Sequence, residues 1–496
     1  MVVKYNTLKY LNILTKFTFF DMLSSTKNKQ ISKRNSVKMN TTLIEKENQI
    51  VNPDKIGIFK DYFSAFKIGT LLNKTGIIKT KGVSPLTIFT IVFNLAFIRK
   101  NLYQGIVKNK SVSIDKDAVY NFLNSSTYNW RRFTLLLVRR IYFIIRNLLD
   151  DASEEVLIFD DSTYDRSRSK KVELLSRVFD HTTKKYIKGF RMLTLGWSDG
   201  NSFLGIDFAL LSSAKISNRY NEINPDIDKR SCGYKRRSEA ITKTTEHLVP
   251  MVKRALSIGI RAKYVVMDSW FSMPSAIAAL REHIHVICML KDQPKWLYEY
   301  KGKKLRLSDL YGKLKKKRGK AKIKANVLVT LSNGKQARII FVPCDKKRGW
   351  LALLSTDLSL PDEEIVRLYG KRWDIEVFFK MCKQHLKLVK EIQLRNYDGL
   401  IGHTSLVFAR YNLLSLFQRQ RVDQRSFGEL FRACHEEMVN ISFIESLKKI
   451  MQLSMEILRK AHGFSEQVIQ SMLDLIMGQA ITYFGLKNDP LVLIEG

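Results

Sequence analysis

The sequence lacks an uninterrupted apolar run of the length that crosses a membrane. Its longest apolar stretch, from Leu86 to Ile98, is interrupted by Asn94 and falls short of the roughly 18 to 20 residues that a helix needs to span a bilayer. Residues 1–20 mix lysines with Phe and Leu, without the apolar core and small-residue cleavage site of a secretory signal. We therefore expect an intracellular protein with no membrane partner.

The cysteine and histidine patterns of disulfide frameworks and zinc sites are also missing. The five cysteines are odd in number, widely scattered and without a Cys-x-x-Cys pair, so neither a disulfide framework nor a zinc site is indicated. His181, His385 and His435 have no spaced partner of metal-ligand type, so a structural or solvent-exposed role is the default for each. We expect none of these histidines to enter an active site.

Acidic residues are scarce relative to basic ones. The 496 residues include 47 Asp and Glu against 84 Lys and Arg, which gives a formal charge of +37 and a pI near 9.9. An excess of this size goes far beyond what solubility requires and indicates a polyanionic partner, with nucleic acid as the first candidate. The chain is also too long for one compact domain, and its length suggests about three.

Changes in residue pattern along the chain predict its organisation. Residues 1–52 include a polar stretch rich in Lys, Ser and Asn, after which Met39 is an alternative start. Apolar residues then recur at helical spacing, and the helix near 133–149 contains or adjoins several arginines that suggest DNA binding. We expect a variable or disordered tail at residues 1–52 and a helical DNA-binding region at 53–150. A catalytic core in two parts is expected at 151–290 and 349–399, with a β-rich insertion between them at 291–348. A helical C-terminal region is expected at 400–496.

Two short apolar strands run directly into aspartates. The first leads to Asp160 and Asp161, and a later one leads to Asp268. The order β-β-β-α-β-α-β is that of a ribonuclease H-like α/β sheet, in which the first and fourth strands lie side by side. That adjacency would bring Asp161 and Asp268 together, and strand register decides whether Asp160 or Asp161 faces the site. The expected strands are 156–159, 190–198, 203–211, 264–267 and 285–290, and the expected helices are 238–257 and 274–282.

A third acidic residue, Glu376, lies in a segment of helical periodicity. Together with Tyr369, Arg372 and Lys383 it occupies positions that fall within an arc of roughly 60° on a single helix. One face of the predicted helix therefore presents a phenol, a guanidinium, a carboxylate and an ammonium. A neighbouring apolar stripe can face the core and anchor the same helix. Its members are Ile375, Phe378, Cys382, Leu386 and Val389.

Three carboxylates from separate elements suit a magnesium site. Phosphodiester hydrolysis and transesterification are commonly catalysed by two divalent cations, and Mg²⁺ prefers oxygen ligands completed by water. We expect two Mg²⁺ ions, or Mn²⁺ in their place, to be held by Asp161, Asp268 and Glu376. Arg372 and Lys383 are suited to binding phosphates. Singly, each acid has a plainer role as a cap or as half of a helical ion pair, but their joint occurrence favours catalysis.

The helical segment resembles the Y-x2-R-x3-E-x6-K signature of the DDE transposases of bacterial insertion sequences at all four signature positions. Residues 158–163 and 266–268 are similar to the two aspartate motifs of that family. Asp161 is favoured over Asp160 because Ser and Thr follow it, as in the family motif. The resemblance covers about 150 to 390 and implies a ribonuclease H-like catalytic domain with a β insertion.

The resemblance also implies a function and further contacts. The protein would bind the ends of its insertion sequence as a homodimer, cleave them and join them to target double-stranded DNA, in the nucleoid of a bacterial cytoplasm. Tyr369, Arg372 and Lys383 would contact the transposon end, and Trp350 would stack on a flipped base, with a core position as the open alternative. Two other functions are kept as alternatives: a catalytically inactive DNA-binding descendant, and a nuclease of the same fold without strand transfer.

Overall fold

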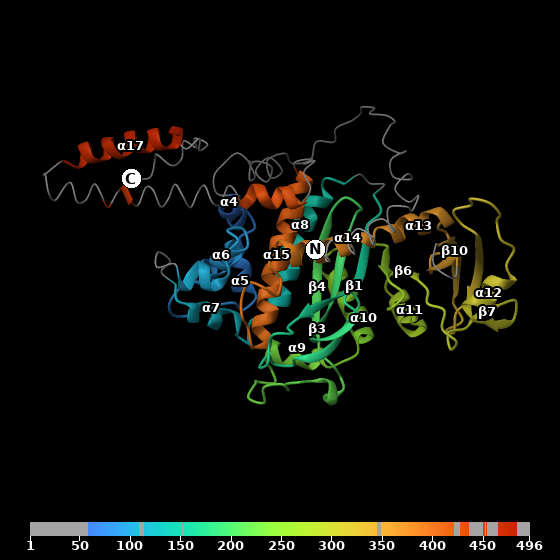
Figure 1. Cartoon of the computed structure of the whole chain (residues 1–496). Coiled ribbons are helices and arrows are strands. Elements are labelled where there is room, and N and C mark those ends of the chain that lie inside the picture. The colour runs from blue at the N-terminus through green and yellow to red at the C-terminus, as the bar shows by residue number, and fades with distance from the viewer. Residues whose placement is uncertain are drawn as a thin grey trace, which may run out of the picture. The chain divides into compact units, whose positions relative to one another are not determined.

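The computed structural model describes residues 58–108, 114–149, 153–344, 349–420, 427–435, 450–451, 453 and 465–483 (Figure 1). Contacts between residues divide the chain into two units, Met1–Pro53 and Asp54–Gly496. The predicted tail lies outside the described residues, so the fold below is that of the second unit. No helix in the described ranges has both the length and the apolar character needed to cross a membrane.

Helices make up most of the described part of residues 58–149. Local capping explains where two of them begin. The Ser84 side chain accepts a hydrogen bond from the Thr87 amide at 3.1 Å, directly before a helix that starts with proline, and the Asn129 side chain accepts one from the Arg132 amide at 3.0 Å. The elements are α4 (Ile58–Ala65), α5 (Ile68–Lys74), α6 (Pro85–Leu95), the π-helix η1 (Tyr103–Val107), α7 (Lys116–Leu123) and α8 (Trp130–Arg146).

One mixed sheet follows, and with its helices it confirms the predicted α/β class. Its strands are β1 (Val156–Asp165), β2 (Ser176–Asp180), β3 (Lys185–Ser198), β4 (Phe203–Leu211), β5 (Tyr264–Met267), β6 (His285–Met289), β7 (Tyr298–Tyr300), β8 (Lys303–Leu305), β9 (Ala325–Thr330), β10 (Gln336–Pro343) and β11 (Trp350–Ser355). The later helices are η2 (Ile216–Asn218, 3-10), α9 (Cys232–Ala240), α10 (Thr244–Ser257), α11 (Pro274–Arg281), α12 (Leu307–Lys313), α13 (Asp362–Gly370), α14 (Trp373–Gln384), α15 (Tyr397–Gln420) and α17 (Glu466–Tyr483).

The strand order brings the aspartate-bearing strands together. It runs β2-β3-β1-β5-β6-β11-β10-β9-β7-β8, with β4 also paired to β3. β1 is antiparallel to β3 and parallel to β5, which is in turn parallel to β6. The prediction that the first strand lies beside the strand ending at Asp268 is therefore confirmed. The strands of residues 298–343 continue this sheet through β11.

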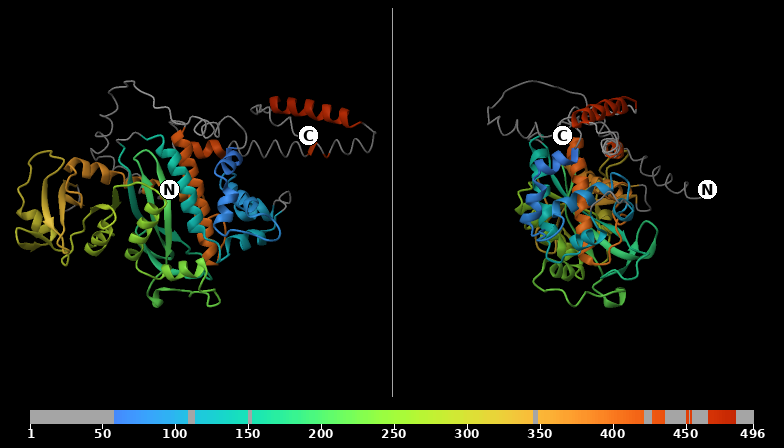
Figure 2. Two further views of the ribbon diagram at one scale, coloured as in Figure 1. Left: turned by 180° about the vertical axis from the view of Figure 1, so that it is seen from behind. Right: turned by 90° about the vertical axis from the view of Figure 1, so that its left-hand side faces the viewer.

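An aromatic core joins α14 and α15 to β4. The Phe378 ring lies 5.2 Å from that of Phe203 and 5.0 Å from that of Phe408. Gly205 on β4 is required at this point, because a Cβ atom there would lie 2.9 Å from the Phe408 ring. α15 also packs along α8, and the left view of Figure 2 shows the two helices side by side. Ile375, Phe378 and Cys382 of the predicted apolar stripe are fully buried on α14, as expected, whereas Leu386 and Val389 lie beyond the end of this helix.

Two predicted helices are each divided in the structure. The helix expected over 238–257 is α9 followed by α10, and the signature helix is α13 followed by α14. The second break lies at Lys371, whose buried ammonium donates hydrogen bonds to the backbone carbonyls of Glu154 and of Asp199, the latter at 2.9 Å. Periodicity could not reveal this break because its cause is a contact with the sheet region, distant in sequence.

Several arginines of the N-terminal helices form ion pairs inside the fold. Asp207, which is 2% exposed on β4, pairs with Arg131 of α8 at 3.3 Å and with Arg254 of α10 at 2.7 Å. Arg131 also forms a bidentate pair with Glu239 of α9. These positive charges therefore hold α8, α9 and α10 against β4. Arg146 likewise pairs with Glu155.

Asp207→Asn is expected to lower the free energy of unfolding by about 3 to 5 kcal/mol, because it leaves the Arg254 guanidinium without its carboxylate and the Arg131 guanidinium with Glu239 alone. Urea unfolding of the full chain measures this loss. Asp226→Asn, at an exposed position, is the matched control and is expected to change stability by no more than about 0.5 kcal/mol. Equal midpoints for the two variants would contradict a stabilising role for this ion network.

Candidate active site

Asp160 and Asp161 lie on opposite faces of β1. Side chains alternate along a strand, so Asp160 shares the face of Ile158, and Asp161 that of Phe159. In the parallel register with β5, Ile158 lies beside Val266. Continuing this register by two residues places Asp268, just past the end of β5, opposite Asp160. The sheet therefore positions Asp160 and Asp268 at the same level and on the same face.

Arg372 connects this face to Glu376. Its guanidinium contacts Asp160 at 3.3 Å through one nitrogen and pairs with Glu376 through the other. Arg372 caps α14, and Glu376 lies one turn further along the same helix. The two carboxylates are thus bridged by one cation. Phe378 and Ile375, both fully buried, hold α14 in this position.

The electrostatics of these groups are strongly coupled. The pKa of Asp160 rises to about 7, mainly because the side chain is buried; Arg372 opposes this rise, while the negative charges of Asp161 and Asp268 add to it. Burial also raises the pKa of Asp161, with Arg191 acting against it and Asp268 in support. Asp160, Asp161 and Asp268 therefore lie close enough to repel one another, which a bound cation would relieve.

The donor set fits a divalent cation in its chemistry. The candidate donors, on Asp160, Asp161, Asp268 and Glu376, are all carboxylate oxygens, the ligands that Mg²⁺ prefers. One of them, Oδ2 of Asp161, is buried without a hydrogen-bond partner. Within the described ranges, no three Asp, Glu, His or Cys side chains are grouped closely enough to hold one ion. At this site the Arg372 guanidinium pairs with both Asp160 and Glu376. A metal ion held by Asp160, Asp268 and Glu376 would therefore have to displace Arg372 from the carboxylates of Asp160 and Glu376.

Asp161 has different partners on the opposite face. Nη1 of Arg191 on β3 lies 2.7 Å from its carboxylate. His181, just after β2, acts electrostatically on Asp161, although a structural or solvent-exposed role was expected for this histidine. β2 was not predicted, and without it the position of His181 could not be known. The sequence signal available was the pair of strand-forming residues Val178 and Phe179.

An exposed tryptophan adjoins Asp268. The Trp270 ring is 49% exposed, lies 6.1 Å from the His181 ring, and has the Lys291 ammonium 5.6 Å from its centroid. Three chain segments thus place an aromatic surface and a cation beside the carboxylates. Sequence reasoning overlooked Trp270, although its position two residues after Asp268 was available as a signal.

Tyr369 and Lys383, two of the residues predicted to bind DNA, have different surroundings. Tyr369, at the end of α13, is half-buried close to Asp268 and Arg372, and this desolvation raises the pKa of its phenol. Lys383 lies two turns beyond Glu376; burial lowers its pKa, and the charges of Asp180 and Asp165 oppose this shift. Its charge partners therefore belong to the neighbouring β1–β2 region.

Trp350 opens β11 and packs in an aromatic cluster. Its ring lies 4.9 Å from that of Tyr311 and 5.2 Å from that of Phe341. The indole is half-buried, since Gly349 and the start of β11 are at the surface. One part of the ring is thus packed against the insertion, and another part is available to solvent.

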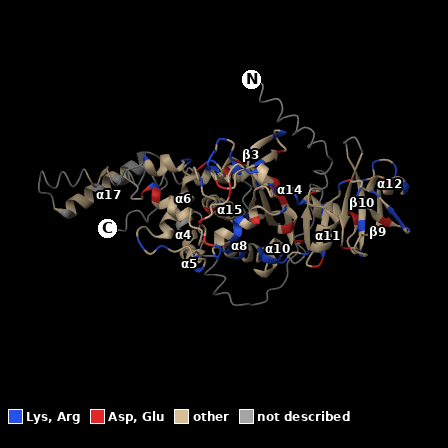
Figure 3. Cartoon of the chain, turned by 90° about the horizontal axis from the view of Figure 1, so that it is seen from below, with Lys and Arg blue, Asp and Glu red and all other residues tan. Residues whose placement is uncertain are grey.

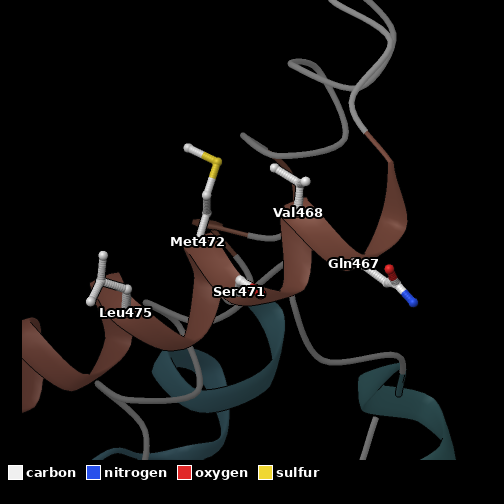
Figure 4. Close-up of a pocket in the computed structure, with 5 residues that line it drawn as sticks. All are labelled: Gln467, Val468, Ser471, Met472 and Leu475. Atoms are coloured by element: carbon white, nitrogen blue, oxygen red, sulfur yellow. The ribbon is translucent and has the colours of Figure 1, made fainter.

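A shallow hollow on α17 is unrelated to these groups. It is lined by Gln467, Val468, Ser471, Met472 and Leu475, whose side chains project from one helix (Figure 4). None of the five is titratable in the physiological range, so the hollow offers no acid, base or metal ligand.

Two family descriptions match the chain. "DDE superfamily endonuclease" matches residues 96–299, and "Transposase DDE domain" matches residues 233–413. Both matches include Asp268, and the second includes Glu376. No curated protein matches the chain. Among solved structures, the chain is similar to "Drosophila P element transposase strand transfer complex" at 11% identity, over 83% of this chain and 93% of that one, with a TM-score of 0.20. The two family matches support a transposase of the DDE type.

Proposed function

We propose that this chain is a metal-dependent DNA transposase with a ribonuclease H-like core, which binds the ends of its own insertion sequence, cleaves them and joins them to target DNA. The observation that supports this most strongly is the position of Asp160, in the middle of β1, opposite Asp268, just past the end of the parallel strand β5, together with the contact of the Arg372–Glu376 pair with Asp160. The strand order around β1 and β5 is the order expected for a ribonuclease H-like sheet, and the two family matches point to the same chemistry.

The proposed reaction has two chemically similar steps. In the first, a water oxygen attacks a phosphorus atom at the element end, the bond to the 3′ oxygen breaks, and a 3′ hydroxyl is released. In the second, that hydroxyl attacks a phosphodiester of the target, and one new phosphodiester replaces the one that breaks. Two bound Mg²⁺ ions would activate the attacking oxygen and stabilise the leaving oxygen.

Asp160, Asp268 and Glu376 are the residues that we propose to hold the metal. Register places the first two on one face, and Arg372 links the third to them. Asp161, which the sequence motif favours, is retained as the alternative first ligand because it also interacts electrostatically with Asp268. When the carboxylates take up metal, the freed Arg372 can bind a phosphate in bidentate fashion.

The remaining DNA contacts follow from position and chemistry. Tyr369 and Arg372 adjoin the carboxylates and are proposed to contact the transposon end, as is Lys383 further along α14. The exposed part of Trp350 is proposed to stack on a flipped base. A homodimer would pair the two ends so that both are cut within one complex.

A cleavage assay with the DNA that flanks the gene tests the proposed function. The full chain, incubated with Mg²⁺ and a duplex containing both element ends, is expected to release 3′ hydroxyls at those ends and to insert them into a supercoiled plasmid. Cutting without insertion would favour the nuclease alternative. Binding without cutting at either end would favour the inactive DNA-binding descendant.

Trp270→Ala is expected to weaken binding of the element end by about 1 to 3 kcal/mol if a base or sugar of the substrate packs on the exposed indole. Trp270→Phe is the matched variant and is expected to retain most of the affinity, since it keeps an aromatic face. Fluorescence anisotropy with labelled end DNA gives both dissociation constants. An unchanged constant for the alanine variant would remove Trp270 from the DNA-binding surface.

A further inference from the structure

The β-rich insertion presents a dense cluster of cations. Between residues 313 and 324, eight of the twelve side chains are Lys or Arg, and none is acidic. In the described part of the chain, none of these eight forms an ion pair with a carboxylate. Figure 3 shows Lys and Arg gathered around α12 and the loop that follows it. The cluster is therefore uncompensated positive charge.

This segment, which we call the basic loop (residues 313–324), is held in a defined conformation. The Lys317 amide donates to the Lys324 carbonyl at 2.8 Å, and the Lys324 amide donates to the Phe341 carbonyl at 2.7 Å. The Lys324 ammonium closes the turn by donating to the Gly319 carbonyl at 2.8 Å. The loop is thus pinned to β10 and folded back on itself, which reduces the entropy lost when it binds a partner.

The anchors of the basic loop point inward and its cations point outward. Ile323 is 5% exposed, and the Lys316 ammonium lies over the Tyr311 ring at 4.9 Å. In contrast, the side chains of Lys315, Lys317, Arg318 and Lys320 are exposed and have no partner in the described ranges. The apolar residues therefore support the loop from below and are not available for insertion into a lipid bilayer.

We propose that the basic loop is a docking surface for the phosphate backbone of duplex DNA, separate from the carboxylate site. This proposal rests on the proposed function, because a chain that cuts and joins DNA must hold duplex segments on both sides of the reacting phosphate. Clustered, exposed cations bind the phosphates of a duplex through their charge, without reading bases. Duplex DNA is favoured over an anionic membrane because none of the loop's three apolar side chains, Leu314, Ala321 and Ile323, is fully exposed.

The test is the salt dependence of binding to a random-sequence duplex. The variant combines Lys315→Gln, Lys317→Gln, Arg318→Gln and Lys320→Gln, and it leaves Lys316 and Lys324 in place because they hold the loop. Each lost phosphate contact lowers the slope of log K against log salt by about 0.9, so the slope is expected to fall by about 2 to 4. The matched control combines Lys229→Gln, Lys235→Gln, Lys243→Gln and Lys253→Gln, which are exposed on or near α9 and α10, and its slope is expected to change by less than about 1.

Equal slopes for the two variants would overturn the proposal, as would loss of binding to phosphatidylserine vesicles with unchanged binding to DNA. The cleavage assay at saturating DNA separates this result from the proposed function. Failure of the proposed function appears as no cutting by the unmodified chain. Failure of the basic-loop proposal appears as equal slopes, whether or not the ends are cut.

Discussion

Glu376→Gln is expected to lower DNA cutting by about 10³-fold or more while leaving binding of the element end nearly intact. The substitution keeps the size and hydrogen-bonding capacity of the side chain but removes the negative charge that a divalent cation requires. Loss of a metal ligand costs several kcal/mol of transition-state stabilisation, and ~4 kcal/mol corresponds to ~10³ in rate. Single-turnover cleavage with saturating protein measures the rate, and anisotropy measures binding.

The matched control for this experiment is Glu363→Gln. Glu363 is exposed in the first turn of α13 and has no ion-pair partner in the described ranges, so its loss tests only the change in net charge. Its cutting rate is expected to stay within about twofold of the unmodified chain, since surface substitutions have small effects. If the Glu376 variant cuts as fast as the control, Glu376 is not a metal ligand.

Asp160→Asn is expected to reduce cutting as strongly as Asp268→Asn, whereas Asp161→Asn is expected to have a smaller effect. The reason is geometric: Asp160 shares a face and a level with Asp268 and contacts the arginine that holds Glu376, while Asp161 is paired with Arg191 on the opposite face. Loss of a shared ligand should again cost several kcal/mol, or about 10³-fold in rate.

The three asparagine variants can be compared directly because each removes one charge at constant volume. Single-turnover cleavage in Mg²⁺ gives the rates, and urea unfolding checks that each variant is folded. A severe loss with Asp161→Asn and a mild one with Asp160→Asn would assign the metal to the opposite face of β1. That outcome would return the first ligand to the residue that the sequence motif favours.

Sequence patterns predicted the parts of this site that depend on local periodicity. The apolar runs that lead to Asp161 and Asp268 and the burial of Phe378 follow from residue patterns that act over a few residues. The first strand is longer than expected from 156–159, because β1 continues to Asp165. The adjacency of β1 and β5 followed from the order of elements. Each of these features could be inferred without knowing any contact between distant residues.

The features that sequence did not predict depend on distant contacts. The break between α13 and α14 follows from the hydrogen bonds of Lys371 to carbonyls of Glu154 and Asp199. His181 comes within electrostatic range of Asp161 because β2 pairs with β3, the strand beside β1. Arg131 is one of the arginines near residues 133–149 that suggested DNA binding, but it pairs with buried Asp207. None of these pairings leaves a periodic signal in the sequence.

The most direct test of the account is anomalous diffraction from crystals of the full chain with an element-end duplex and Mn²⁺. We predict two manganese peaks about 3.5 to 4 Å apart, ligated by Asp268, Glu376 and an aspartate of β1, with Arg372 moved from the carboxylates to a phosphate. Manganese bound elsewhere in the complex, with Arg372 still bridging Asp160 and Glu376, would contradict the account.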